Sequence, residues 1–290
     1  PTKNTANTAL VWHAGRFLAT WEGGAPHALT LPELETLGKF TFQNQLTSAV
    51  TAHPKIDPQS GEMFFFGYAF APPYLQHSIV SQDGDRLKTM PIELPIGVMM
   101  HDFAITENYA LFMDLPLTGR PERAAQGQPF LAFEGDRPSR FGILPKYGSP
   151  DDIRWFESPA CYIFHVLNAY EDGDTVVLIA CRKPSFGLSE DEADSAAAYL
   201  YEWRFDLASG DVQERPLSPL PCEFPRINEA YMGRQMRYGY ASKMTPTPLP
   251  LFDSILKFDF AQGTVELPTD VHELGANRHC IVLLTCLATS

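Results

Sequence analysis

Short apolar runs separated by tight polar turns recur along most of this chain, and this rhythm constrains its fold more than any other feature. Asp-x-x-x-Gly turns occur at 57–61, 206–210 and 259–263. Asp begins such turns by accepting hydrogen bonds from backbone amides, and Gly tolerates the positive φ at their end. The runs between the turns are rich in β-branched and aromatic residues, as in 63–68 and 175–180. The sequence therefore predicts an all-β protein.

Helical periodicity is scarce in this chain. Residues 189–199 open with a helix-capping pattern but run directly into a predicted strand at 201–205. We interpret this segment as a loop or a single helical turn. Many short strands without alternating helices leave three architectures open, which are a sandwich, a barrel and a propeller.

Three histidines occupy equivalent places in three hairpin patterns. His53, His101 and His165 each precede a predicted turn by a few residues, and each turn leads into an apolar strand. The intervals between them, 48 and 64 residues, each match about one four-stranded sheet with a decorated loop. A propeller brings equivalent strands to one axis, so a residue that repeats once per blade converges there, whereas a sandwich gives no such reason. The spacing favours a propeller with a shared histidine centre over three unrelated structural histidines.

The other histidines are predicted to be structural or exposed. His13 falls at a turn, and His27 and His77 lie in loop-like surroundings. Phe103 lies two residues from His101, so strand alternation predicts that the two side chains share one face.

Composition limits the classes of function. No linker divides the 290 residues, so we expect one domain over 1–290. The net charge of −13 argues against binding to nucleic acid, which requires clustered Lys and Arg. The five cysteines have no CxxC spacing, which favours a reduced, cytoplasmic protein over a disulfide scaffold or a zinc ribbon. The longest apolar stretches are of strand length, so neither a signal peptide nor a membrane span is expected.

Five segments around these histidines carry a recognisable pattern, namely 7–11 together with 21–24, then 52–57, 100–106, 164–165 with 168–171, and 223–228. These segments occur in the order known from the carotenoid cleavage oxygenases, a family that includes stilbene-cleaving enzymes and a visual-cycle isomerase. The chain resembles this family from near its start to about Arg278.

The resemblance implies a seven-bladed β-propeller whose axis carries a non-haem Fe(II) ion bound by four histidines, three of which would be His53, His101 and His165. It also implies outer glutamates that hydrogen-bond to ligand histidines, and Glu22 and Glu223 fall at two of these positions. A carboxylate that accepts the distal ring N–H fixes the tautomer and orientation of an imidazole. Neutral imidazoles bind Fe(II), Zn(II) and Cu(II) alike, so only the resemblance selects iron.

The function that the resemblance implies is oxidative cleavage of a conjugated C=C bond by O2, which yields aldehyde or ketone products. The substrate would be an apolar polyene, namely a carotenoid or apocarotenoid, or else a stilbene. The resemblance further implies possible peripheral contact with a membrane, and a location in the plastid if the source is a plant.

The end of the chain departs from the family pattern. The family's third outer glutamate and its fourth histidine ligand have no match here, and 279–290 form an atypical tail. We therefore expect the propeller to lack its last part. Two further functions stay open, which are a catalytically inactive remnant that binds polyenes and a three-histidine zinc hydrolase.

Overall fold

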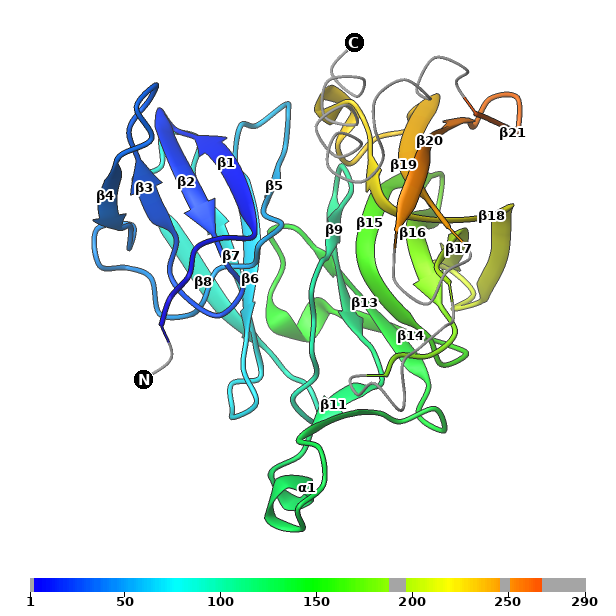
Figure 1. The fold of residues 1–290 in the computed structure, drawn as a ribbon, viewed down its shortest axis with the longest axis horizontal. Coiled ribbons are helices and arrows are strands. Elements are labelled where there is room, and N and C mark those ends of the chain that lie inside the picture. The colour runs from blue at the N-terminus through cyan, green and yellow to red at the C-terminus, as the bar shows by residue number, and fades with distance from the viewer. Residues whose placement is uncertain (1–2, 188–196, 246–250, 268–290) are drawn as a thin grey trace.

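The regular secondary structure of the described residues consists almost entirely of β-strands. The computed structural model describes residues 3–187, 197–245 and 251–267 (Figure 1). The all-β prediction is confirmed. The predicted helical turn at 189–199 falls mainly, and the tail at 279–290 entirely, outside the described residues, so both stay predictions.

The first two sheets each contain four antiparallel strands in chain order. The first sheet comprises β1 (Ala9–His13), β2 (Arg16–Thr20), β3 (His27–Leu29) and β4 (Thr36–Lys39). The second sheet comprises β5 (Lys55–Ile56), β6 (Met63–Tyr68), β7 (Leu75–Val80) and β8 (Leu87–Ile92). The turn between β5 and β6 has the predicted chemistry, because Asp57 accepts a hydrogen bond from the Gln59 amide and Gly61 has a φ of 69°.

The third sheet also has four strands, with a hairpin inserted within it. Its members are β9 (Ala104–Ile105), β10 (Tyr109–Asp114), β13 (Ser139–Pro145) and β14 (Arg154–Ser158). The insertion follows β10 and pairs two short strands around the single turn of helix that projects at the bottom of Figure 1. It consists of β11 (Leu117–Gly119), α1 (Pro121–Ala125) and β12 (Leu131–Phe133).

The last sheet has seven strands and divides naturally at β18. Residues 212–216 and Pro221 of this long strand pair with β17, whereas residues 222–226 pair with β19. The sheet is therefore two four-stranded units that share one strand. Its members are β15 (Tyr162–Asp172), β16 (Thr175–Lys183), β17 (Tyr199–Asp206), β18 (Val212–Arg226), β19 (Tyr238–Met244), β20 (Phe252–Asp259) and β21 (Thr264–Glu266).

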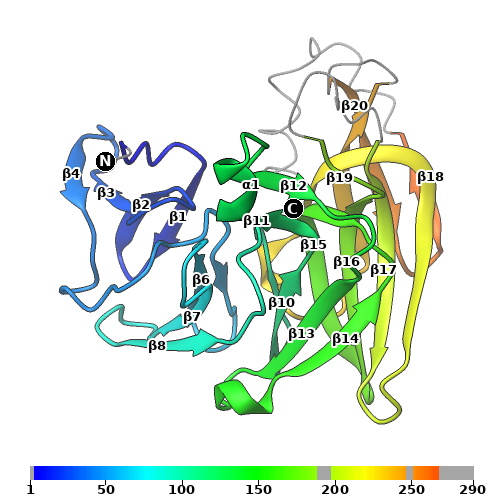
Figure 2. The ribbon, with the colours of Figure 1, turned by 90° about the horizontal axis from the view of Figure 1, so that it is seen from below.

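Successive four-stranded antiparallel units are the blades of a β-propeller. Figure 2 shows the first sheet at one end of the molecule, the seven-stranded sheet at the other, and the second and third sheets between them. The propeller prediction is confirmed at the level of architecture. The count of seven blades and the single domain over 1–290 stay predictions.

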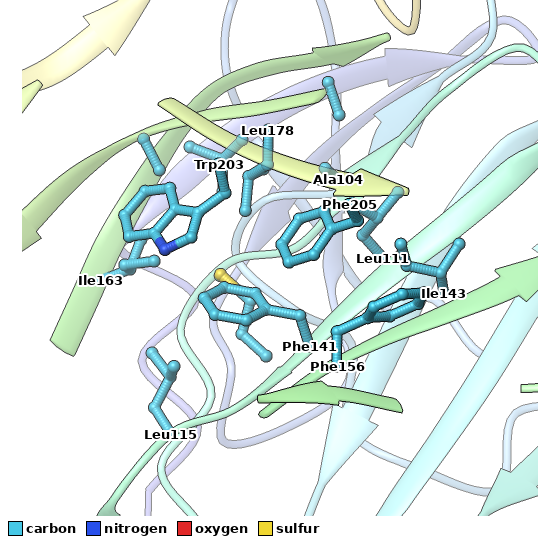
Figure 3. Packing of buried hydrophobic residues seen from close by; sticks show 14 of the residues in the cluster. Ala104, Leu111, Leu115, Phe141, Ile143, Phe156, Ile163, Leu178, Trp203 and Phe205 are labelled. Carbon is cyan, nitrogen blue, oxygen red and sulfur yellow. The ribbon is translucent and has the colours of Figure 1, made fainter. Parts of the chain in front are cut away.

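Aromatic side chains hold the third sheet against the fourth. Figure 3 shows Phe141 and Phe156 of the third sheet facing Trp203 and Phe205 of β17. The ring centroid of Phe141 lies 5.6 Å from that of Trp203 and 5.2 Å from that of Phe205. All four side chains are buried, so the core of this region lies between blades and not only within them.

Polar side chains also join neighbouring blades. The Lys146 ammonium, beyond the end of β13, lies 2.6 Å from a carboxylate oxygen of Asp57, in the turn after β5. Glu171 of β15 accepts hydrogen bonds from the Thr106 hydroxyl and the Asn108 amide, both in the turn that follows β9. These contacts fix the relative positions of the turns that close the three histidine hairpins. Within the described ranges, no helix is both long and apolar enough to span a membrane.

Candidate metal centre

The three histidines lie on or just before the edge strands of three successive sheets. His53 precedes β5, His101 precedes β9, and His165 lies on β15. Each of these strands is an edge strand of its sheet and forms a hairpin with the strand that follows. In Figure 1 these three strands lie beside one another in the middle of the molecule. The propeller architecture therefore brings together residues that are far apart in the chain.

The ring nitrogens converge on one small volume. The Nε2 atoms of His53 and His101 are 3.0 Å apart. One ring nitrogen from each of the three histidines lies within 4.8 Å of the others. The ring centroids are 4.8 to 5.1 Å apart, with interplanar angles between 64° and 88°. The rings thus present their edges to a common point and do not stack on one another.

Two carboxylates orient two of these rings from behind. The Nδ1–H of His101 donates to Glu22 over 2.7 Å, and the Nδ1–H of His165 donates to Glu223 over 2.6 Å. A ring that donates from Nδ1 presents Nε2 as a free lone pair, which is the tautomer that a metal ligand needs. The Tyr68 hydroxyl donates to the other oxygen of Glu22 over 3.3 Å, so this carboxylate is itself held in place.

The protonation of the histidines follows from burial and from these carboxylates. Burial lowers the pKa of His53 to about 3, so its ring is neutral near pH 7. Burial also disfavours the charged form of His101, but the hydrogen bond and charge of Glu22 outweigh this effect and raise the pKa of His101. Since a metal binds only deprotonated imidazole, the raised pKa of His101 makes metal binding there compete with protonation.

Irregular strand pairing aims His165 and Glu223 at each other. The register between β15 and β16 shifts on both sides of Val166, the residue after His165. The register between β18 and β19 shifts between Glu223 and Arg226. Phe224 lies inside this second irregularity with a φ of 54°, a left-handed conformation that is costly for a bulky residue. β-bulges redirect side chains in this way and are common beside functional sites.

Aromatic rings form the apolar surroundings of the centre. The Phe164 ring lies 5.3 Å from that of His101, and the Phe224 ring lies 4.9 Å from that of His165, measured between centroids. Phe186 in turn packs 5.1 Å from Phe164. The sequence analysis missed the contacts of Phe164 and Phe224, although each directly adjoins a candidate site residue in the chain.

Strand alternation predicted that the side chains of Phe103 and His101 share one face. The Phe103 ring instead packs into the core. Its side chain is fully buried and packs against Phe66 and Phe112, with centroid distances of 5.3 and 6.0 Å. The prediction was wrong because His101 and Phe103 both precede β9, so the alternation of faces within a strand does not relate them.

The histidines predicted to be structural lie outside the cluster. The Nε2 atom of His13 lies 3.0 Å from the carbonyl oxygen of Gly61, and the Nδ1 atom of His77 lies 3.2 Å from that of Phe65. The expectation of loop-like surroundings for His27 and His77 was wrong, because these residues lie on β3 and β7. Short strands with mixed polar and apolar residues are difficult to distinguish from loops by sequence.

The donor set of the cluster suits a metal ion. Two nitrogens that bind one ion at right angles, with bonds of about 2.1 Å, lie about 3 Å apart, and the His53 and His101 Nε2 atoms are 3.0 Å apart. At this distance the two nitrogens can also share a proton in an Nε2–H···Nε2 hydrogen bond, which a bound metal ion would replace. Neutral imidazole with carboxylate support is compatible with Fe(II), Zn(II) and Co(II).

Comparisons with known proteins agree with this geometry. The family model described as "Retinal pigment epithelial membrane protein" matches residues 1–282. The chain is 43% identical over 266 residues to carotenoid 9,10(9',10')-cleavage dioxygenase 1 of Phaseolus vulgaris, which covers 88% of this chain and 49% of that protein. It therefore spans about half the length of this curated relative.

Two solved structures share the fold of the chain. The lignostilbene dioxygenase of Pseudomonas brassicacearum superposes with a TM-score of 0.82 and 33% identity, over 91% of this chain and 60% of that one. Cobalt-substituted apocarotenoid oxygenase of Synechocystis superposes with a TM-score of 0.77 and 27% identity, over 95% and 60% of the two chains. The second structure shows that the relatives include metalloenzymes. From the family match and the identity to the bean enzyme, the chain belongs to the retinal pigment epithelial membrane protein family, which includes the carotenoid cleavage dioxygenases.

Proposed function

We propose that this chain carries the metal centre of a non-haem Fe(II)-dependent dioxygenase that cleaves a conjugated C=C bond of a carotenoid or apocarotenoid. The observation that carries the proposal is the cluster of His53, His101 and His165, two of which donate to buried or half-buried glutamates. The same chain is 43% identical to a carotenoid 9,10(9',10')-cleavage dioxygenase. We include the single domain over 1–290 in this proposal.

Each site residue has a distinct role in the proposed reaction. The three histidines would hold Fe(II) through Nε2, while Glu22 and Glu223 keep the rings of His101 and His165 in the required tautomer. Bound ferrous iron would supply the redox-active ion that allows O2 to react with an alkene. In the overall reaction the C=C bond breaks and one oxygen atom enters each of the two carbonyl products, so no further reductant is needed.

The surroundings of the centre favour a substrate that is nearly all hydrocarbon. Phe164 and Phe224 present aromatic rings to the histidines. Apolar walls bind a polyene through contact area and exclude water from the reacting bond. Because such substrates dissolve in lipid, we include peripheral contact with a membrane in the proposal, and a location in the cytoplasm or, for a plant protein, the plastid.

A stilbene is the second candidate substrate. It is favoured by the lignostilbene dioxygenase structure, which shares 33% identity and a TM-score of 0.82 with this chain. A stilbene is shorter than a carotenoid but presents the same type of conjugated C=C bond between apolar groups. A metal ion at the histidine centre would react with either substrate, and the rest of the binding site would determine which of them binds.

The first test is iron binding by the purified protein. It would be reconstituted with Fe(II) without oxygen, and its metal content would be measured after desalting. We expect stoichiometric iron in the wild type and little in His101→Ala. His27→Gln is the matched control, because it alters a histidine of β3 outside the cluster and should retain iron. Equal iron in all three proteins would contradict the proposed ligand set.

The second test identifies the reaction. The iron-loaded protein would be incubated with an apocarotenoid or a stilbene under 18O2, and the products would be analysed by mass spectrometry. Labelled carbonyl products from either substrate support the dioxygenase and select the substrate class. Iron binding without cleavage would support the alternative of an inactive polyene-binding protein. Zinc-dependent ester hydrolysis that His101→Ala abolishes would support the hydrolase instead.

A further inference from the structure

The Asp102 carboxylate contacts the chain next to all three histidines. One oxygen, Oδ1, accepts a hydrogen bond from the Lys55 ammonium over 2.7 Å and from the Phe103 amide over 2.8 Å. The other oxygen, Oδ2, accepts from the Val166 amide over 2.8 Å. In sequence, Asp102 directly follows His101, Val166 directly follows His165, and Lys55 is two residues after His53.

We propose that Asp102 is a positioning residue of the metal centre, which sets the spacing of the three histidine-bearing segments through its contacts with Lys55 and Val166. This inference rests on the proposed function, because it concerns the same metal site. Asp102 would not touch the metal or the substrate. It would act through the backbone on which the ligands are carried.

The burial of Asp102 makes these contacts obligatory. Only 2% of the residue is exposed, and Lys55 is also buried, with 9% exposed. A buried carboxylate is tolerated only when it is paired and hydrogen-bonded. Asp102 satisfies this requirement with donors from Lys55, from Val166 and from the neighbouring Phe103 amide. Moving the segment of Lys55 or of Val166 would leave a charged oxygen or a donor without its partner.

The Val166 contact lies at the free edge of β15, which has no further strand paired to it within the described ranges. β15 is the edge strand of its sheet, and its register with β16 shifts on both sides of Val166. At this point the regular ladder does not define where β15 lies relative to β9. The Asp102–Val166 hydrogen bond therefore fixes the position of His165, which strand pairing alone does not fix.

A second, weaker bridge links only two of the histidines. The Thr51 hydroxyl accepts from the His53 amide over 3.1 Å and donates to the His101 carbonyl over 3.4 Å. This bridge does not reach His165. The Asp102 carboxylate is the group that contacts the chain beside all three ligands, which is why we assign the positioning role to it.

A second buried ion pair provides a matched control. Asp57 and Lys146 are both buried, and their charged atoms lie 2.6 Å apart. This pair also joins two blades, but Asp57 is four residues from His53 and its hydrogen bonds go to Lys146, Gln59 and Arg234. If Asp102 served stability alone, the loss of either carboxylate would have the same consequences.

The experiment measures Co(II) binding to the purified protein and the visible absorption spectrum of bound Co(II), which depends on ligand number and geometry. Asp102→Asn retains the size of the side chain but leaves one donor facing an amide NH2 group. We expect its Kd for Co(II) to rise about 10- to 100-fold, the usual cost of removing a residue that orients metal ligands, and its spectrum to change. Asp57→Asn should lower the melting temperature but leave the Kd and the spectrum as in the wild type.

A double variant guards against misfolding of Asp102→Asn. Lys55→Met combined with Asp102→Asn removes both charges, so no uncompensated charge remains buried, while the Val166 amide still loses its carboxylate. We expect the double variant to fold and to show the same altered spectrum. Wild-type Kd and spectrum in the folded Asp102 variants would overturn the inference alone. Failure of the wild type to bind Co(II) would instead overturn the proposed metal site and this inference with it.

Discussion

Acidification should destabilise the folded chain through His77, which lies outside the cluster of three histidines. Its side chain is fully buried on β7, against the rings of Phe64 and Phe112. Burial lowers the pKa of His77 from 6.5 to about 4, against the opposing effect of the hydrogen bond to the Phe65 carbonyl. Nδ1 faces that carbonyl, and Nε2 is buried without a partner among the described residues. A charged ring would therefore bury an additional unpaired N–H.

The sign of the effect follows from proton binding in the two states. In the unfolded chain the ring takes up a proton near pH 6.5, whereas in the folded chain it does so only near pH 4. Between these values the unfolded state binds more protons, so the free energy of unfolding falls as the pH falls. Each pH unit in this window corresponds to about 1.4 kcal/mol. We therefore expect a loss of about 2 kcal/mol from His77 between pH 7 and pH 5, and about 3 kcal/mol by pH 4.

The measurement compares urea unfolding of the wild type and His77→Phe at pH 7 and at pH 5. Phe retains an aromatic ring between Phe64 and Phe112 but cannot take up a proton. Between the two pH values the wild type should lose about 2 kcal/mol more than the variant. Other buried groups titrate equally in both proteins and cancel in this difference. An equal loss in both would show that His77 does not titrate as its burial requires, and would refute the reasoning.

Two further predictions concern the core and the second carboxylate. Trp203→Ala should lower the free energy of unfolding by about 3 to 5 kcal/mol, because Trp203 is fully buried against Phe141. Urea unfolding measures this loss, and a value below about 1 kcal/mol would contradict the packing role. Glu223→Gln should weaken metal binding about 10- to 100-fold, because the His165 Nδ1–H then loses its charged acceptor. Calorimetric titration with Co(II) checks this value, and an unchanged affinity would exclude Glu223 as an orienting residue.

The strand-and-turn pattern was sufficient to predict an all-β fold, and the histidine spacing predicted a propeller in which the histidines meet. Turn residues such as Asp57 and Gly61 act locally, so their effect can be read from the sequence alone. The approximate repeat of one histidine per four-stranded unit then predicts that the three histidines meet at the centre of the propeller. Glu22 and Glu223 came from the resemblance to a family, since no local pattern distinguishes them from other glutamates on strands.

Other features could not be predicted, because they depend on where strands begin and end. Phe103 was assigned to the wrong environment because strand alternation was applied to Phe103 and His101, which both precede the two-residue strand β9. His77 was predicted to have loop-like surroundings, although it lies in the middle of a buried, regularly paired strand. The contacts of Asp102 join residues 47 and 64 positions apart, so they appear only once the blades are packed.

The histidine cluster lies at points where backbone ladders give little positional control. His53 and His101 precede strands of only two residues each, and His165 is followed by a register shift. Regular pairing aims side chains alternately to the two faces of a sheet, and not in its plane toward the point where the three edges meet. The irregular backbone releases the side chains from that alternation, but it also removes the hydrogen bonds that would hold them.

Side-chain bridges replace the missing ladder bonds. Thr51 and Asp102 hold the backbone beside the histidines, and Glu22 and Glu223 hold two of the rings. Phe224 adopts a left-handed conformation, which costs of order 1–3 kcal/mol, and its amide donates to Glu223 over 2.6 Å while its ring packs against His165. The strained residue is thus bonded to the same carboxylate that it helps to place. The positions of the three histidines therefore depend on hydrogen bonds that side chains form with the backbone and with the rings. A substitution that preserves the strands can still move the histidines apart.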